Sequence, residues 1–413
     1  MKKENSKEIN KEKKEEFDKK EFLGQNDNPL CKSIKEEFHK YEPIGLTNFG
    51  KTGYMNSTLQ CLCNIDKLVS YFKYSQKIEN FIQRHGNTTL TYSFKYLIEN
   101  LWKSPGSKYI LPKYNEEHSF SPRDFKDKIS SMNHSFEEKG FHSPTELLKF
   151  IIETLHKELN KKTNNSDLSN NYQKIDQTNH DMVFKLFIQN FKENFRSIIS
   201  DLFFGISGFS LECLNCKTTK YRFHEYFFLF FPLEEVRKFK KQKLTNSNNQ
   251  NMMSMNPNQF KQNQFDDIYS VNLDDCFQYN EQTHFFNGEN AIYCYECHKV
   301  YSTNYIEKLY YGPEILIIIL RSGRGLEYDV NLEYTEKIDL SQYFQMKNFG
   351  NVYNLIGGVI HLGGGGDGHF ISFAKSPIDG LWNVYNDSFV FKESDSIKQV
   401  EGIPYILFYQ KEK

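Results

Sequence analysis

The chain has 413 residues, of which 38% are hydrophobic and 16% aromatic, which is enough for one large domain or two ordinary ones. Its 52 basic and 53 acidic side chains give a net charge of -1, so neither nucleic acid nor an anionic membrane is expected as a partner. There is no apolar run of about 18 residues and no apolar core near the N-terminus, so we expect no membrane span and no secretory signal. A cytoplasmic or nuclear location follows, in which the eight cysteines are thiols or metal ligands rather than disulfides.

Residues 1–40 are predicted to form a charged tail outside the folded domain. The first 22 residues carry 15 charges of mixed sign, and pairs such as Glu15 and Lys19 have the spacing that supports a solvated helix. Few apolar side chains are available to pack, so we expect a disordered segment or a lone helix.

Residues 41–413 are predicted to form one α+β domain, with a helical half followed by a β half. The segment TELLKFIIETLHKEL, residues 145–159, has the helical period, and similar patterns continue to about residue 202. After residue 203, short aromatic or β-branched runs such as EILIIILRS predict an antiparallel sheet. The Asn-rich residues 160–181 are interpreted as a surface loop, and residues 237–264 as a disordered insertion.

The segment NFGKTGYMNSTLQCL, residues 48–62, predicts a tight turn followed by a buried helix that begins near Thr52. A cysteine in the first turn of such a helix would have a lowered pKa and could act as a nucleophile. Position 53 is instead glycine, while the amide of Asn48 is placed to stabilise an oxyanion. Cys61 and Cys63 lie two to three helical turns further on and are expected in the core.

A second segment, GGVIHLGGGGDGHFISFAK, presents His369 at the start of a strand after a glycine-rich loop. Asn386 and Asp387, in LWNVYNDSFV, lie at a strand end, where one of them could hold the Nδ1–H of His369. Taken alone, this pattern also fits a structural or exposed histidine.

Two CxxC pairs, separated by 77 residues, predict a closed tetrahedral Zn²⁺ site with a structural role. The alternatives are four unrelated thiols, or a site in which His298 replaces one cysteine. Cys31 and Cys276 are given no role. The four predicted ligands are Cys213, Cys216, Cys294 and Cys297.

The first of these segments resembles the cysteine box of the ubiquitin-specific proteases, a peptidase family (type C19) of deubiquitinating enzymes. That box runs Gly-Leu-x-Asn-Leu-Gly-Asn-Thr-Cys-Tyr-Met-Asn-Ser-x-Leu-Gln. The chain departs from it at Gly53, in the place of the nucleophilic cysteine, and at Lys51, in the place of asparagine. The matching residues are Gly45, Leu46, Asn48, Gly50, Thr52, Tyr54, Met55, Asn56, Ser57, Leu59 and Gln60.

The second segment is similar to the histidine box of the same family. The resemblance implies that His369 is the general base, that Asn386 is the third member of the triad, and that Asp387 assists the site. It also implies that Gly368 and Tyr54 contact the substrate and that His361 is structural. The residues that match the family around Asn386 are Trp382, Tyr385, Asn386, Asp387, Ser388 and Val390.

A third family block, Gln-Asp-(Ala/Ser)-x-Glu-Phe, is represented more weakly by HSPTELLKF. Glu146 matches the family's glutamate, whereas His142 and Ser143 replace the glutamine and the aspartate. Pro144 is compatible with the first turn of the helix that follows.

The resemblance implies a papain-like fold with a thumb at about 41–200, fingers at about 201–312 and a palm at about 313–410. The fingers would carry the zinc ribbon and grip ubiquitin, whose Gly-Gly tail would enter between thumb and palm. Three functions remain open. In the first, the chain is a catalytically inactive pseudo-deubiquitinase that binds ubiquitin or a ubiquitinated protein. In the second, it is an active deubiquitinase altered at position 53. In the third, it is a scaffold subunit of a larger assembly. The changes at Lys51, His142 and Ser143 favour the first, and the retained Asn48, His369, Asn386 and Asp387 favour the second.

Overall fold

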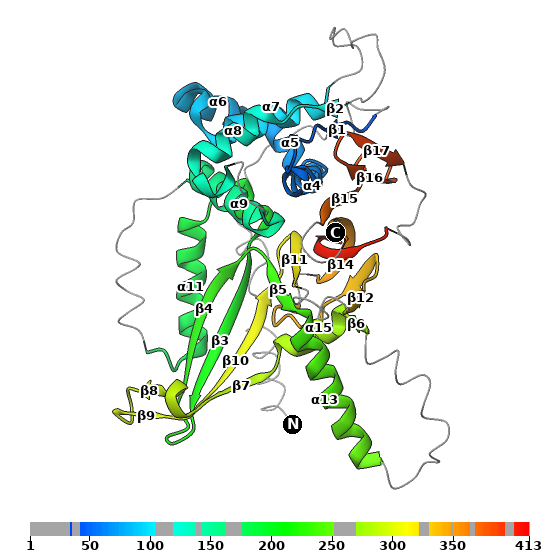
Figure 1. Cartoon of the computed structure of the whole chain (residues 1–413). Coiled ribbons are helices and arrows are strands. Elements are labelled where there is room, and N and C mark those ends of the chain that lie inside the picture. The colour runs from blue at the N-terminus through cyan, green and yellow to red at the C-terminus, as the bar shows by residue number, and fades with distance from the viewer. Residues whose placement is uncertain are drawn as a thin grey trace, which may run out of the picture.

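The computed structural model divides the chain into a helical part, a four-stranded sheet and an eight-stranded sheet (Figure 1). The α+β class and the change from helices to strands near residue 203 are confirmed. The structure describes Ile34 and residues 42–103, 119–137, 142–161, 176–251, 270–321, 330–347, 350–363, 368–392 and 400–412.

The helical part surrounds α4, in which every residue is buried. The predicted helix over 145–159 is α9, which begins at Pro144 and is capped by the Ser143 hydroxyl, an acceptor for the amide of Thr145. The helices of this part are α4 (Gly53–Leu62), α5 (Asp66–Tyr74), α6 (Gln76–His85), α7 (Leu90–Leu101), α8 (Arg123–Met132), α9 (Pro144–Leu159), α11 (His180–Asn194) and α12 (Ile198–Phe203).

The four-stranded sheet has the order β4-β3-β10-β7, and α11 packs on one of its faces (Figure 1). Phe223 of β4 and Ile206 of β3 form a small core with Val183 and Phe187 of α11. A separate hairpin, β8–β9, lies at the far end of this sheet from α4. The strands are β3 (Gly205–Cys213), β4 (Thr219–Tyr226), β7 (Thr283–Phe286), β8 (Ile292–Cys294), β9 (Lys299–Tyr301) and β10 (Thr303–Tyr311).

The eight-stranded sheet is buried on both faces at its centre. In β11, Ile315, Ile317 and Ile319 face the core of the helical part, because alternate residues of a strand point to opposite sides. The residues between them face a second core, which contains α13 (Leu233–Asn251) and α15 (Leu273–Asn280). The order is β17-β16-β15-β14-β18-β11-β5, with β13 paired to β14. The strands are β5 (Leu229–Pro232), β11 (Ile315–Arg321), β13 (Lys337–Asp339), β14 (Val352–Leu362), β15 (His369–Lys375), β16 (Trp382–Asn386), β17 (Phe389–Lys392) and β18 (Ile403–Lys411).

Two short parallel pairs complete the fold. The pair β1 (Gly45–Leu46) and β2 (Ser119–Phe120) lies next to β17, and the pair β6 (Ser270–Asn272) and β12 (Asn331–Glu333) lies beside α15.

The structure differs from the sequence prediction at two places. Residues 237–251 continue helix α13, where a disordered insertion was expected, because Leu233 and Val236 are buried and Phe239 packs against Tyr279 of α15. The rest of that insertion, residues 252–264, lies outside the described residues, as do most of the Asn-rich loop and of the tail. Ile34 of the predicted tail is fully buried and donates its amide hydrogen to the Ser70 hydroxyl, so the folded core includes this position.

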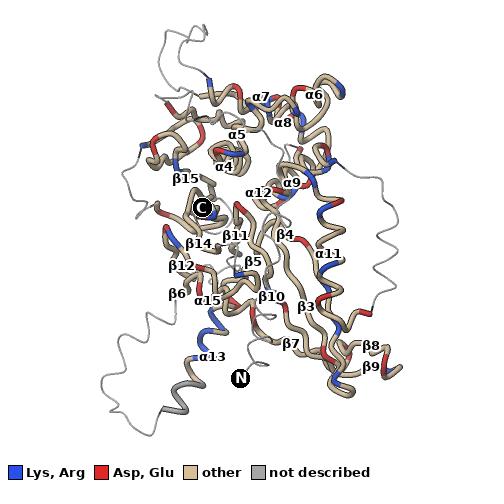
Figure 2. Tube along the Cα trace, turned by 180° about the vertical axis from the view of Figure 1, so that it is seen from behind, with Lys and Arg blue, Asp and Glu red and all other residues tan. Residues whose placement is uncertain are grey.

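Acidic and basic residues are interspersed along the described chain, which fits the net charge of -1 (Figure 2). None of the helices in the described part of the chain combines the length and the apolar character needed to cross a bilayer.

Candidate functional site

Helix α4 begins at Gly53, as the sequence predicts, and a pinned turn leads into it. Asn48 Oδ1 accepts hydrogen bonds from the backbone amides of Gly50, at 2.8 Å, and Thr52, at 3.2 Å. Gly50 has a φ of 104°, a conformation that favours glycine. The turn therefore fixes position 53 at the N-terminus of a buried helix, where free backbone N–H groups and the helix dipole favour negative charge.

The imidazole of His369 lies against Gly53. A Cβ atom at position 53 would be 2.8 Å from His369 Cε1 and 2.9 Å from its Nδ1, closer than van der Waals contact allows. The His369 side chain is 38% exposed, which leaves it room to swing outward. The residues that the sequence singled out as nucleophile position and base, 316 positions apart, are therefore brought into contact.

Asn386 orients His369 through the ring nitrogen Nε2, whereas the sequence predicted a bond through Nδ1. His369 Nε2 lies 2.8 Å from Asn386 Oδ1, whereas the sequence interpretation had assigned this bond to Nδ1. Because an amide oxygen can only accept, Nε2 carries the hydrogen in this arrangement and the lone pair of neutral Nδ1 faces position 53. This is the tautomer that a base for a residue at 53 requires.

Asp387 connects the two segments of the site. Its carboxylate accepts hydrogen bonds from the side-chain amides of Asn48, at 2.8 Å, and Asn56, at 2.7 Å, and lies 3.4 Å from His369 Nε2. The amide of Asn48 that was predicted to face an oxyanion thus has one hydrogen committed to Asp387. Asn56 was not assigned a role from the sequence, although it matches the cysteine box and lies one turn after Gly53 on α4.

We predict that Asp387→Asn destabilises the fold by about 2 to 4 kcal/mol, because the new amide nitrogen would face a side-chain amide donor of Asn48 or Asn56. Asparagine keeps the size of the side chain and tolerates the backbone φ of 52° at this position. Urea unfolding followed by circular dichroism measures the effect. The neighbouring Asn386→Ala variant is the control, with an expected loss below about 1 kcal/mol, and equal stability of Asp387→Asn and the unchanged chain would contradict the assigned network.

The residues of the third family block lie near the first turn of α4, where His142 contacts Tyr54. Tyr54, which is expected to contact the substrate, is only 3% exposed, and its ring centroid lies 5.0 Å from that of His142. His142 Nε2 also lies 2.9 Å from the backbone oxygen of Glu137. Ser143 caps α9 and lies 3.3 Å from the hydroxyl of Tyr405.

Gly368 lies directly before β15, and its place allows no side chain. A Cβ atom there would be 1.8 Å from His361 Nε2, so His361 packs tightly against this backbone. Burial, with a smaller contribution from His369, lowers the pKa of His361, which favours a neutral ring. This position fits the structural role that the sequence gave to His361.

Cys61 and Cys63 lie in the core, as predicted. They are 3% and 1% exposed, and burial raises the pKa of both thiols well above its usual value. Neither thiol replaces the missing nucleophile, because the thiol form is strongly favoured and both residues lie two or more helical turns after position 53.

The four predicted metal ligands come together at the end of the four-stranded sheet. The Sγ atoms of Cys213, Cys216, Cys294 and Cys297 all lie within 4.8 Å of one another. The pair Cys213–Cys297 is 3.9 Å apart and the pair Cys216–Cys294 is 3.7 Å apart. A tetrahedral site with Zn–S bonds of about 2.3 Å places its sulfurs about 3.8 Å apart, so the cluster fits Zn²⁺. His298 is not part of this group.

Comparisons with known proteins agree on one family. The family described as ubiquitin carboxyl-terminal hydrolase (UCH) matches residues 44–409. The chain is 25% identical to human ubiquitin carboxyl-terminal hydrolase 2 over 376 residues, which are 89% of this chain and 54% of that protein. It is 21% identical to ubiquitin carboxyl-terminal hydrolase Usp2 of Drosophila melanogaster over 380 residues, 89% of this chain and 34% of that protein. The chain therefore spans about a third to a half of these relatives.

Solved structures share the fold. The Ubp8 SAGA DUB module with Sgf11, Sus1 and Sgf73, bound to monoubiquitin, matches with a TM-score of 0.61 and 18% identity, over 90% of this chain and 69% of that one. The yeast SAGA DUB module matches with a TM-score of 0.60 and 18% identity, over 90% of this chain and 68% of that one. The thumb, palm and fingers fold expected from the sequence is thereby confirmed.

Proposed function

Because the chain belongs to the ubiquitin carboxyl-terminal hydrolase family, we propose that it binds ubiquitin, or a ubiquitinated protein, without hydrolysing it. The observation that carries the proposal is Gly53 at the N-terminus of α4, in contact with the imidazole of a retained His369. Glycine has no side chain, so no acyl-enzyme can form at this position. Cys61 and Cys63 are buried thiols that cannot replace it.

The proposed binding site has three parts. The fingers, at about 201–312, and the palm, at about 313–410, hold the body of ubiquitin. The thumb, at about 41–200, and Gly368 border the slot for its Gly-Gly tail. A hydrogen-bond network then stabilises the slot, because it joins the turn before α4 to the β16–β17 connection. Its members are Asn48, Asn56, His369, Asn386 and Asp387.

We further propose that the four cysteines hold a structural Zn²⁺. When bound, such an ion closes its own coordination sphere with four thiolates and supplies no catalysis. The ribbon joins β3, through Cys213, to the β8–β9 hairpin, and so would set the shape of the end of the fingers. We place the protein in the cytoplasm or the nucleus, where thiols stay reduced.

Titration calorimetry with ubiquitin tests the proposal. We expect the chain as it stands to bind ubiquitin, and ubiquitin that lacks its C-terminal Gly-Gly to bind at least about tenfold more weakly, because the tail would no longer reach the slot beside Gly53. Equal binding of both forms would place the contact outside the slot. Absence of binding to either form would refute the proposal.

Two further functions stay in view. The retained hydrogen-bond network favours an active deubiquitinase altered only at position 53. The Gly53→Cys variant tests this alternative. The Ubp8 modules carry Sgf11, Sus1 and Sgf73, which supports the idea of a scaffold in a larger assembly. A scaffold would bind a stoichiometric partner in a pull-down and would not bind ubiquitin.

A further inference from the structure

A hydrogen bond joins the helical part of the chain to the eight-stranded sheet, close to the candidate site. The Ser143 hydroxyl, at the N-terminus of α9, lies 3.3 Å from the Tyr405 hydroxyl of β18. The two residues are 262 positions apart, and both are only partly buried. The bond therefore links two parts of the fold at a place that solvent can reach.

On the sheet side, Tyr405 belongs to a row of three rings. The Phe370 ring lies 5.3 Å from that of Tyr405 and 4.8 Å from that of His361. The three residues come from the neighbouring strands β18, β15 and β14. Phe370 directly follows His369, and its backbone oxygen would be 3.3 Å from a Cβ atom at position 53. The row of rings therefore begins at the candidate site itself.

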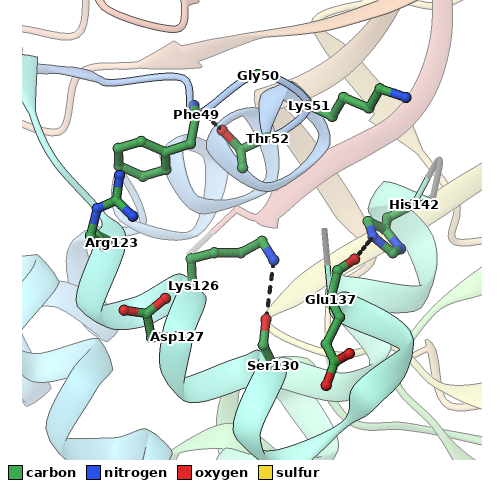
Figure 3. A pocket seen from close by; sticks show the side chains of 10 residues that line it. All are labelled: Phe49, Gly50, Lys51, Thr52, Arg123, Lys126, Asp127, Ser130, Glu137 and His142. Carbon is green, nitrogen blue, oxygen red and sulfur yellow. Dashed lines mark hydrogen bonds between the residues drawn. The ribbon is translucent and has the colours of Figure 1, made fainter. Parts of the chain in front are cut away.

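On the helical side, Ser143 is held next to the first turn of α4. Its neighbour His142 contacts the ring of Tyr54, with centroids 5.0 Å apart, and Tyr54 directly follows Gly53. Figure 3 shows His142 below the turn at Thr52 that leads into α4. Ser143 and Tyr405 thus complete a closed ring of contacts, which starts at Gly53 and returns to it through His369.

We propose that the hydrogen bond between Ser143 and Tyr405 is a latch, which closes the slot in the free chain and opens when the tail of ubiquitin enters. A peptide backbone that contacts atoms on both sides needs about 7 Å between them, because each contact takes about 3.5 Å. The two hydroxyl oxygens are 3.3 Å apart, so they have to separate before the tail passes between them. This inference rests on the proposed function and adds a conformational step to it.

A latch of this kind lowers the affinity for ubiquitin, because binding has to break the hydrogen bond first. Removal of either hydroxyl should therefore increase the affinity by about three- to tenfold, the range that one hydrogen bond supplies. Tyr405→Phe keeps the ring that packs against Phe370. Ser143→Gly removes the other hydroxyl, and glycine is tolerated at a helix N-cap.

Titration calorimetry of the full chain with ubiquitin tests the latch. We expect Tyr405→Phe and Ser143→Gly each to bind complete ubiquitin about three- to tenfold more tightly than the unchanged chain does. The double variant should gain no more than either single variant, because both changes break the same bond. Ubiquitin that lacks its C-terminal Gly-Gly should show no gain. The matched control is Tyr409→Phe on the same strand, which loses a bond to the Thr335 backbone oxygen in the other core and should leave the affinity unchanged.

The possible outcomes separate the latch from the proposed function. If the unchanged chain and Tyr405→Phe bind ubiquitin equally well, the latch is overturned and the proposed function stands. Weaker binding by Tyr405→Phe would also overturn the latch, because the hydroxyl would then contact ubiquitin directly. A gain of equal size for ubiquitin without its tail would place the effect outside the slot and overturn the latch. Binding by the two variants alone would support a latch that shuts the slot fully, and absence of binding by every chain would refute both inferences.

Discussion

Replacing Gly53 with cysteine is expected to produce hydrolysis of a fluorogenic ubiquitin amide at a rate on the order of 10³ or more above that of the chain as it stands. Loss of the nucleophile from a catalytic triad costs on the order of 10⁶ in rate, so restoring it should return a large part. The remaining parts are in place, since His369 Nε2 is bound to Asn386 Oδ1 and its Nδ1 faces position 53.

The gain depends on one adjustment. The imidazole lies 2.8 to 2.9 Å from the place of a Cβ atom at 53 and must move outward to accept a side chain. Because its side chain is 38% exposed, the movement meets little packing, and the expected rate stays below that of an undisturbed triad. A new thiol there would also be stabilised as a thiolate by the N-terminus of α4.

Three controls make the measurement decisive. Gly53→Cys combined with His369→Ala should fall back to the background, because the thiol would lose its base. Gly53→Ser should stay near background. Hydrolysis by the unchanged chain at a rate similar to that of Gly53→Cys would refute the proposed inactivity. If Gly53→Cys binds ubiquitin but remains inactive, the loss of activity involves further residues such as Lys51 and His142.

Removal of one cysteine of the cluster is expected to have the largest effect on stability. Apparent binding free energies of structural zinc sites are about 10–16 kcal/mol, and much of this energy stabilises the fold. Cys294→Ser should therefore reduce bound zinc from one ion per chain to nearly none and should destabilise the β8–β9 hairpin by on the order of 5 kcal/mol.

Metal content by mass spectrometry and hydrogen exchange across residues 292–301 measure these two effects. The control is Tyr295→Ser, which changes the neighbouring residue of the same segment, is 68% exposed and supplies no ligand. A chelator should reproduce the effect of Cys294→Ser. A chain that is isolated without zinc and has full exchange protection in this hairpin would contradict the assignment of a structural metal.

The sequence by itself determined the features that depend on local spacing. The start of α4 near Thr52, the burial of Cys61 and Cys63 and the place of Pro144 in the first turn of α9 follow from helical periodicity, glycine turns and the preferences of the first turn. The CxxC pairs and the residues around His369 are short motifs whose chemistry is readable without a fold. Residues 237–251 show the limit of this approach, since their polar composition predicted disorder while contacts with α15 hold the helix.

The tertiary structure decided which of these residues meet and through which atoms. Asp387 bonds to Asn48 and Asn56 across more than 330 positions, because β1 pairs with β2 beside β17 and brings the turn before α4 to the β16–β17 connection. Nδ1 of His369 faces Gly53 while Nε2 is bound to Asn386 Oδ1, an arrangement that no local pattern encodes. The same holds for Lys126, which is an ordinary helical lysine in the sequence. In the fold it is only 8% exposed and donates to the Ser130 hydroxyl and the Phe136 backbone oxygen, because burial and pairing are set by the packing of segments around it.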